Sequence, residues 1–202
     1  MIELLYGTTN KGKLLVMKRA LKPMGIEVKG LKALNMQIPK VKETGSSLLE
    51  NARLKAKAYY QAFHLPVFSC DTGLYFENLP EKLQPGIYAR RPLGCEMTDE
   101  QLTAYYSGLA QKFGDFKAQY RNAVCFCKSE QEIYESEMPQ LSGKPFLLTS
   151  VPHPISQKGF PIDRISIQIS SGKYYYDLPG NAQDEAAFGE GFQEFFSTAL
   201  KV

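Results

Sequence analysis

Two carboxylates flank a short turn of small residues in the stretch ETGSSLLENA, Glu43 to Ala52. Glu43 precedes the Thr-Gly-Ser-Ser turn, and Glu50 follows it. The spacing from Ser47 to Glu50 is typical of a helix capping box, which accounts for Glu50. It does not account for Glu43, and a carboxylate at such a turn can hold Mg²⁺, which prefers oxygen ligands. The pattern alone leaves both a helix cap and a cation site open.

A third carboxylate, Asp71, follows an apolar stretch from Pro66 to Ser69 and precedes Thr72 and Gly73. We interpret the apolar stretch as a strand that ends at Asp71, and ligands gather at strand ends in α/β sheets. An acid there can bind a metal ion or take a proton from water. The alternative is an Asx-turn, in which Asp71 bonds to its own backbone. The pattern favours neither interpretation.

Two further segments carry groups suited to phosphate. The stretch GTTNKGK, Gly7 to Lys13, joins an expected strand to an expected helix, whose free N–H groups favour an anion. It lacks the spacing of a phosphate-binding P-loop, and a plain turn capped by Thr or Asn explains it as well. Arg90 and Arg91 are adjacent in a loop rich in turn formers, where they could clamp a phosphate or simply face solvent.

Hydrophobic periodicity supplies the elements that must position these residues. One helix is expected from the GTTNKGK turn to about residue 21, and a second from the ETGSS turn to about residue 63. A third is expected to follow a capping box at Thr98 and Gln101 and to end at about residue 113. A fourth is expected over 181–200, where Gly189 and Gly191 weaken it. Strands are expected over 2–7, 26–34, 66–71, 73–77, 116–128, 132–138, 144–151 and 164–169. This order predicts an α/β or α+β protein with a mixed sheet. The strand-rich segment over about 115–175 would form a second lobe of one domain, residues 1–202, with a ligand cleft between the lobes.

Composition restricts the class of protein. The chain has 202 residues and 44% hydrophobic residues, enough for a sizeable core, and no apolar run of the length that a membrane span needs. The N-terminal stretch is too short and too polar for a signal peptide, so we expect a cytoplasmic protein. Four cysteines without a CxxC pair and only two histidines argue against a structural zinc site and favour reduced thiols.

Charge is unevenly distributed, although the net charge is only +3. Residues 1–64 carry 12 Lys and Arg against 4 Glu, and the rest of the chain is acidic. A basic first third suits a polyanionic ligand, although solvated helix faces explain the charge as simply. Without a dense basic block, long nucleic acid is not an expected partner.

Taken in order, four of these segments resemble the inosine triphosphate pyrophosphatase family. The family carries T-x-N-x-x-K after its first strand, then a long E-T-G-x-[ST]-F-x-E-N-A-x-x-K-A element, D-[ST]-G-L, and P-G-x-x-[SA]-x-R. The matching segments here begin at Thr8, Glu43, Asp71 and Pro85, and Leu48 replaces the Phe of the second element. The second element is long and specific, and all four lie within residues 1–91.

The resemblance implies an elongated mixed sheet flanked by helices, two lobes around a central cleft, and a homodimer. It implies hydrolysis of a nucleoside triphosphate to the monophosphate and pyrophosphate with Mg²⁺. Glu43 and Asp71, with Glu50 nearby, would place the metal, Asp71 would accept the proton of the attacking water, and Thr72 would contact the nucleotide. The side chains that would bind the triphosphate or neutralise its charge are Thr8, Asn10, Lys13, Lys55 and Arg91, or Arg90 in its place.

The second half departs from the family pattern. The family's G-F-G-Y-D-P element closes over base and ribose, and here it reads GFPIDRI, which keeps Phe160 and Asp163 as contacts but replaces Gly-Tyr by Pro161-Ile162. The late Lys and Ser-His-Arg groups that read the purine have no counterpart in residues 181–192. We therefore expect retained pyrophosphohydrolase chemistry, house-cleaning of nucleotides such as ITP and XTP, and altered base specificity. The main alternative is a catalytically weak nucleotide-binding or sensor protein of the same fold. The sequence does not identify the preferred base, the sugar, the oligomeric state or which arginine contacts phosphate.

Overall fold

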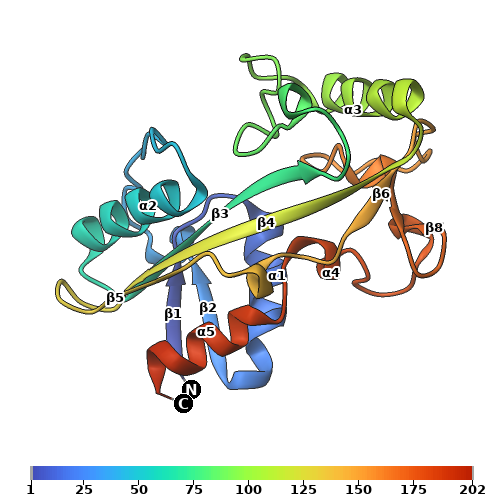
Figure 1. Ribbon diagram of the computed structural model, residues 1–202. Helices are drawn as coiled ribbons and strands as arrows, with labels where there is room; N and C mark the ends of the chain where they lie inside the picture. Colours follow the sequence, from blue (N-terminus) through green and yellow to red (C-terminus); the bar gives the residue numbers. More distant parts are fainter. Residues whose placement is uncertain (1, 202) are drawn as a thin grey trace. The chain divides into compact units, whose positions relative to one another are not determined.

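The computed structural model describes residues 2–201, whose contacts divide into two compact units. The first unit contains the chain up to Thr72, Asn122–Ser142 and the residues from Phe188 onward, and the second contains Gly73–Arg121 and Gly143–Ala187. Figure 1 labels their helices and strands. Two long strands, β3 (Val67–Phe76) and β4 (Phe116–Cys127), contribute residues to both units.

The first unit is built on parallel strands. β1 (Ile2–Tyr6) pairs in parallel with both β2 (Ile26–Gly30) and β3. The last residues of β4 belong to this unit and pair antiparallel with β5 (Ile133–Ser136). Parallel and antiparallel pairs thus occur in one sheet, which confirms the predicted mixed α/β fold.

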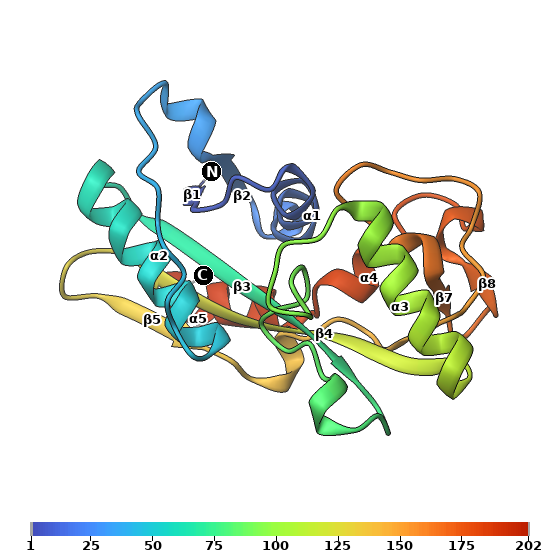
Figure 2. The same cartoon turned by 90° about the horizontal axis from the view of Figure 1, so that it is seen from above.

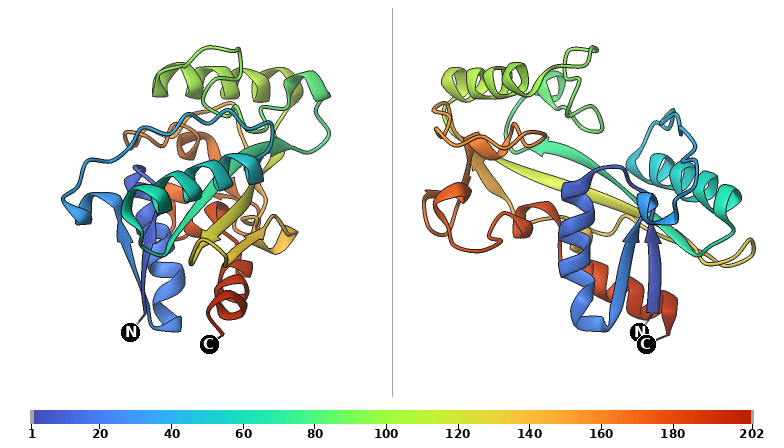
Figure 3. Two further views of the ribbon diagram at one scale, coloured as in Figure 1. Left: turned by 90° about the vertical axis from the view of Figure 1, so that its left-hand side faces the viewer. Right: turned by 180° about the vertical axis from the view of Figure 1, so that it is seen from behind.

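Three helices belong to the first unit: α1 (Lys11–Leu21), α2 (Leu48–Phe63) and α5 (Gly191–Leu200). α1 packs against β2 and α5, an arrangement seen from behind in the right-hand view of Figure 3. α2 buries an apolar face formed by Leu48, Ala52, Ala56, Tyr59 and Phe63. Tyr6 stacks on Phe68 with ring centroids 4.5 Å apart, and Phe196 of α5 packs edge-on against Phe68 at 4.9 Å.

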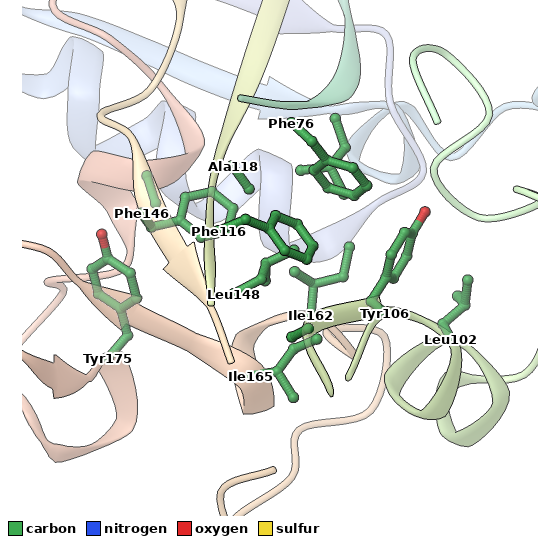
Figure 4. Packing of buried hydrophobic residues seen from close by; sticks show 13 residues of the cluster. Phe76, Leu102, Tyr106, Phe116, Ala118, Phe146, Leu148, Ile162, Ile165 and Tyr175 are labelled. Atoms are coloured by element: carbon green, nitrogen blue, oxygen red, sulfur yellow. The ribbon is translucent and has the colours of Figure 1, made fainter. Parts of the chain in front are cut away.

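The second unit combines antiparallel strands with α3 (Asp99–Phe113), which is well seen in Figure 2. β6 (Phe146–Leu148) pairs with the start of β4 and with β7 (Ser166–Gln168), which pairs with β8 (Lys173–Tyr174). The unit ends with the short α4 (Asp184–Ala187). α3 begins with the predicted capping box of Thr98 and Gln101. Apolar side chains from these elements gather in one core cluster around Phe76, Phe116 and Phe146 (Figure 4).

Two strand predictions were wrong. The strand expected over 26–34 ends at Gly30, because its partner β1 ends at Tyr6 in the register Tyr6–Gly30, and Leu31–Leu34 form a 3-10 helix. The two strands expected on either side of Thr72 are the single strand β3. Gly73 does not make a turn: a Cβ there would lie 2.9 Å from the carbonyl oxygen of Gly86, so glycine allows a close backbone approach. Asp71 therefore lies inside a strand and not at its end.

The cysteines are free thiols, of which Cys70, Cys125 and Cys127 are buried and Cys95 is exposed. Burial raises the pKa of the Cys70 thiol to about 11. Among residues 2–201, none of the helices combines the length and apolar composition needed to cross a bilayer.

Candidate active site

Lys55 joins the two acids that the sequence singled out. Its Nζ lies 2.7 Å from Asp71 Oδ1, 2.9 Å from Glu43 Oε1 and 3.4 Å from the carbonyl oxygen of Cys70. The side chains of Lys55 and Asp71 are only 12% and 11% exposed, whereas that of Glu43 is 42% exposed. Acids from a loop and from a strand therefore meet at one partly buried ammonium, with Glu43 on the solvent side.

Asn51, which the sequence analysis did not select as a site residue, links the loop to the strand. It lies one helical turn before Lys55, so both side chains leave the same face of α2. Its Nδ2 donates to Asp71 Oδ2 at 3.4 Å, and its Oδ1 accepts from the backbone N–H of Gly45 at 2.9 Å. A Cβ on Gly45 would lie 2.8 Å from Asn51 Oδ1, so glycine is needed for this approach. The signal available in the sequence was a polar residue on the otherwise buried face of the helix.

Glu50 serves the cap of α2. Ser47 is the N-cap, and its Oγ accepts from the N–H of Glu50 at 3.1 Å, as predicted. The Glu50 carboxylate returns to Ser46, accepting from its N–H at 2.7 Å and from its Oγ at 2.8 Å. These hydrogen bonds lower the pKa of Glu50. The structure thus places Glu50 Oε2 on the turn and not at the Lys55 junction.

The loop before α1 uses its polar groups locally. Asn10 is the N-cap, with Oδ1 accepting from the N–H groups of Gly12 at 2.8 Å and Lys13 at 3.1 Å. Thr8 Oγ1 in turn accepts from the N–H of Asn10 at 3.2 Å. The plain cap that the sequence left open is therefore present, and it engages N–H groups that an anion would otherwise use.

The two lysines differ in electrostatic environment. The pKa of Lys13 is lowered, chiefly because its ammonium is buried, and Cys70, Asp71 and Glu43 offset this only in part. Burial also acts against the charge of Lys55, but Asp71 and Glu43 outweigh it and raise its pKa. Lys13 is close enough to Lys55 for the two charges to repel, so the first unit places two positive charges beside these acids.

Thr72 is held by a second asparagine that sequence reasoning missed. Its Oγ1 donates to Asn122 Oδ1 at 2.7 Å, and Asn122 Nδ2 donates to the carbonyl oxygen of Leu141 at 2.9 Å. Asn122 is a buried polar residue at the start of the apolar run NAVCFC, and that interruption was the signal. The pair fixes the backbone of β3 directly after Asp71.

In the second unit, the two adjacent arginines have different surroundings. Arg90 Nη2 donates to Asp99 Oδ1 at 2.8 Å. The Arg91 guanidinium lies 5.1 Å from the ring centroid of Tyr88 and lines an open cavity of about 320 Å³ with Tyr88, Gln84 and neighbouring residues. Arg90 is therefore engaged within its own unit, whereas Arg91 faces a space that a ligand could enter.

The altered GFPIDRI segment is hydrogen-bonded to α3 within the second unit. The N–H of Gly159 donates to Asp99 Oδ2 at 2.6 Å, and Thr103 Oγ1 donates to the carbonyl oxygen of Pro161 at 2.9 Å. Phe160 is half-buried. Asp163 begins a 3-10 helix, and burial raises the pKa of its carboxyl to about 6.

Asp163→Asn should stabilise the protein above neutral pH. The pKa of the Asp163 carboxyl in the folded protein, about 6, lies above its ordinary value of 3.8. The folded protein therefore keeps this proton to a higher pH than the unfolded chain does. The free energy of unfolding of wild type consequently falls as pH rises from about 4 to about 6. We expect the variant to exceed wild type by about 2 kcal/mol in free energy of unfolding at pH 7.5, and the difference to vanish near pH 4. Urea unfolding across this range measures it. Asp115→Asn, at an exposed acid, is the control, and an Asp163→Asn difference independent of pH would contradict the assignment.

Comparison with known proteins gives a consistent result. The Ham1 family model matches residues 4–145. The chain is 41% identical over 140 residues to a dITP/XTP pyrophosphatase of Rhodopseudomonas palustris, covering 67% of this chain and 65% of that protein. It is 42% identical over 90 residues to the protein of that name from Aquifex aeolicus, covering 45% of this chain and 42% of that one. The chain thus spans about half to two thirds of the length of these curated relatives.

Likeness of fold extends further along the chain than likeness of sequence. The Ham1 protein of Staphylococcus aureus superposes with a TM-score of 0.70 at 24% identity, over 97% of this chain and 98% of that one. A HAM1 protein from Coxiella burnetii gives a TM-score of 0.70 at 21% identity, over 100% of this chain and 98% of that one. The segments after residue 145 therefore keep the fold while lying outside the part that the family model matches. With four motifs in family order and a match over residues 4–145, the chain belongs to the Ham1 family, which is the inosine triphosphate pyrophosphatase family that its motifs resemble.

Proposed function

We propose that the protein is a nucleoside triphosphate pyrophosphohydrolase, cleaving the α–β phosphoanhydride with water to give a nucleoside monophosphate and pyrophosphate. The observation that carries this proposal is the meeting of Glu43 and Asp71 at Lys55. The names of the curated relatives, dITP/XTP pyrophosphatase, support the same reaction.

The donor set fits a divalent ion that is shared with the substrate. Among residues 2–201, no group of three or more His, Cys, Asp or Glu side chains could by itself hold a metal. Mg²⁺ is commonly bound by one or two carboxylates together with substrate phosphates and water. Glu43 and Asp71 supply such a pair, so we propose Mg²⁺ held by these two acids. The ion would offset charge on the polyphosphate and on the leaving pyrophosphate.

Asp71 is the residue we propose as proton acceptor. Its two carboxylate oxygens accept hydrogen bonds from different partners, Oδ1 from Lys55 and Oδ2 from Asn51, and this fixes the orientation of the carboxylate. An oriented, ionised carboxylate can align a water molecule and take its proton as the oxygen attacks phosphorus. The rigid backbone of β3, held through Thr72 and Asn122, limits the movement of this group.

Cationic side chains would neutralise the polyphosphate. Lys13 and Lys55 lie beside the acids in the first unit. Following the family motif, Arg91 would add a third charge, and the engagement of Arg90 with Asp99 supports Arg91 as the phosphate contact. We propose Thr8, Thr72 and Asn10 as further nucleotide contacts, with Phe160 and Asp163 contacting the base and ribose.

Altered base specificity is the part of the proposal that a nucleotide panel tests. The family match ends at residue 145, before GFPIDRI and the 181–192 segment. We expect pyrophosphate release from several nucleoside triphosphates with Mg²⁺, without the strong selectivity for ITP and XTP that the missing base-reading groups would give. Phosphate-specific and pyrophosphate-specific assays on the same panel establish which bond is cleaved. Strong, selective hydrolysis of ITP and XTP would contradict altered specificity, and no release from any nucleotide would contradict the enzyme.

A catalytically weak sensor of the same fold is the second candidate, and the divergence after residue 145 is the observation that favours it. Nucleotide binding by calorimetry without turnover on the panel would support it. The retained acids favour the enzyme, because a binding protein has no need of an oriented base beside a metal.

We also propose a cytoplasmic homodimer. The resemblance to the family supports this assembly, and the exposed apolar residues Leu93, Val151 and Ile155 offer surface for it. Light scattering that gives the monomer mass at every concentration would contradict the dimer.

A further inference from the structure

The charge balance at the Lys55 junction is the starting point. Two carboxylates that lie close together repel each other, and a cation placed between them offsets this repulsion. Here that cation is part of the chain: the Lys55 ammonium contacts Glu43 at 2.9 Å and Asp71 at 2.7 Å. It therefore occupies the place between the acids where their charge is best neutralised.

We propose that Lys55 is a resident counter-ion, which holds the divalent-ion position between Glu43 and Asp71 and is exchanged for the metal only when a polyphosphate arrives with it. This inference rests on the proposed metal-dependent function and adds to it a role for one residue. In the loaded state, the ammonium would move to a phosphate oxygen.

The surrounding contacts permit such an exchange. Lys55 has a flexible four-carbon stem, whereas its helix is fixed at the start by the Ser47 and Glu50 cap. Asp71 Oδ2 stays hydrogen-bonded to Asn51 when Oδ1 loses the ammonium. Glu43, on the more exposed side, is open to an incoming ion. The acids can thus keep their places while the cation between them changes.

Exchange has a thermodynamic consequence. A metal ion arriving alone must displace Lys55 and leave a partly buried ammonium without an anionic partner, beside the positive charge of Lys13. A polyphosphate arriving with the metal gives that ammonium a new anionic partner. Metal and polyphosphate should therefore each strengthen the binding of the other by the same factor. Metal alone should bind weakly, because Lys55 competes for the acids.

Removing the competitor tests this directly. We expect Lys55→Met to bind Mn²⁺, in the absence of any nucleotide, about tenfold more tightly than wild type, as measured from the free-ion electron paramagnetic resonance signal. Lys57→Met changes the net charge equally at an exposed position of the same helix and should match wild type. Lys55→Arg keeps the charge and should also stay close to wild type. A merely structural role for Lys55 would not make its loss strengthen binding.

The outcomes separate this inference from the proposed function. Thermal unfolding establishes that each variant is folded, and Lys55→Gln is a second neutral variant should Lys55→Met fail that test. If the neutral variants bind Mn²⁺ as tightly as wild type or more weakly, Lys55 is not a counter-ion. Turnover of the nucleotide panel by wild type would then still support the proposed enzyme activity. Absence of Mn²⁺ binding in wild type and in every variant overturns both this role and the metal site.

Discussion

Turnover by Asp71→Asn is expected to fall at least about a hundredfold, the lower end of what a positioned base contributes. The amide keeps the size and shape of the side chain but cannot accept the proton of the attacking water. Asn51 and Lys55 both donate to Asp71, so one of them would then face an N–H₂ group in place of an oxygen. Pyrophosphate release under saturating nucleotide and Mg²⁺ measures the effect.

The control for Asp71→Asn is the same substitution at an acid outside the proposed site. Asp115→Asn makes the same chemical change at an exposed acid and should retain wild-type turnover. Mn²⁺ binding by Asp71→Asn separates the two roles proposed for Asp71, proton acceptor and metal ligand. If the variant still binds Mn²⁺ but has lost turnover, Asp71 acts as the proton acceptor. If it has lost both, Asp71 is a metal ligand. Turnover within a few-fold of wild type would show that another group takes the proton.

The second large effect concerns stability, at Gly143 in the second unit. A Cβ on Gly143 would lie 1.9 Å from the carbonyl oxygen of Ala186, and the atoms in the way are backbone atoms that no side-chain rotation can move. Nearby hydrogen bonds hold the two segments in place: the N–H of Lys144 donates to Glu185 O at 2.6 Å, and the N–H of Gly143 donates to Tyr120 O at 3.0 Å. We expect Gly143→Ala to lower the free energy of unfolding by about 3 kcal/mol or more.

Gly108→Ala provides the matched control in the same unit. Gly108 is exposed within α3, and a Cβ there meets nothing within 4 Å. Because alanine is the better helix former, this variant should be more stable by up to about 1 kcal/mol. Urea unfolding of both variants decides the matter. Equal small effects would show that the segment at Ala186 moves away freely.

The sequence predicted the chemistry of the first unit better than its geometry. Glu43, Lys55 and Asp71 were selected because their types and order match a specific motif, and the structure brings them together. The position of Asp71 was misjudged, because a Thr-Gly pair is a common turn signal, whereas here Gly73 allows the close approach of Gly86, which is distant in the sequence. Asn51 and Asn122 were missed for the same reason: their partners, Asp71 and Thr72, are remote in sequence.

The surroundings of Arg90 and Arg91 could not be predicted from the sequence. Adjacent arginines have the same chemistry, and only the tertiary partner distinguishes them. Asp99, which engages Arg90, was expected in α3 but not beside the loop. The helix caps, by contrast, were predictable because capping depends on residues three or four apart, as at Ser47 and Thr98.

The placement of the thiols has a practical consequence. Cys70, Cys125 and Cys127 are buried, and the pKa of Cys70 is raised, so we expect these groups to react slowly with alkylating reagents. Cys95 alone among the four is exposed, and it lies between Arg91 and Asp99 in the chain. We therefore expect a maleimide dye to attach selectively at Cys95, without engineering the chain, and to give a fluorescent reporter four residues after Arg91.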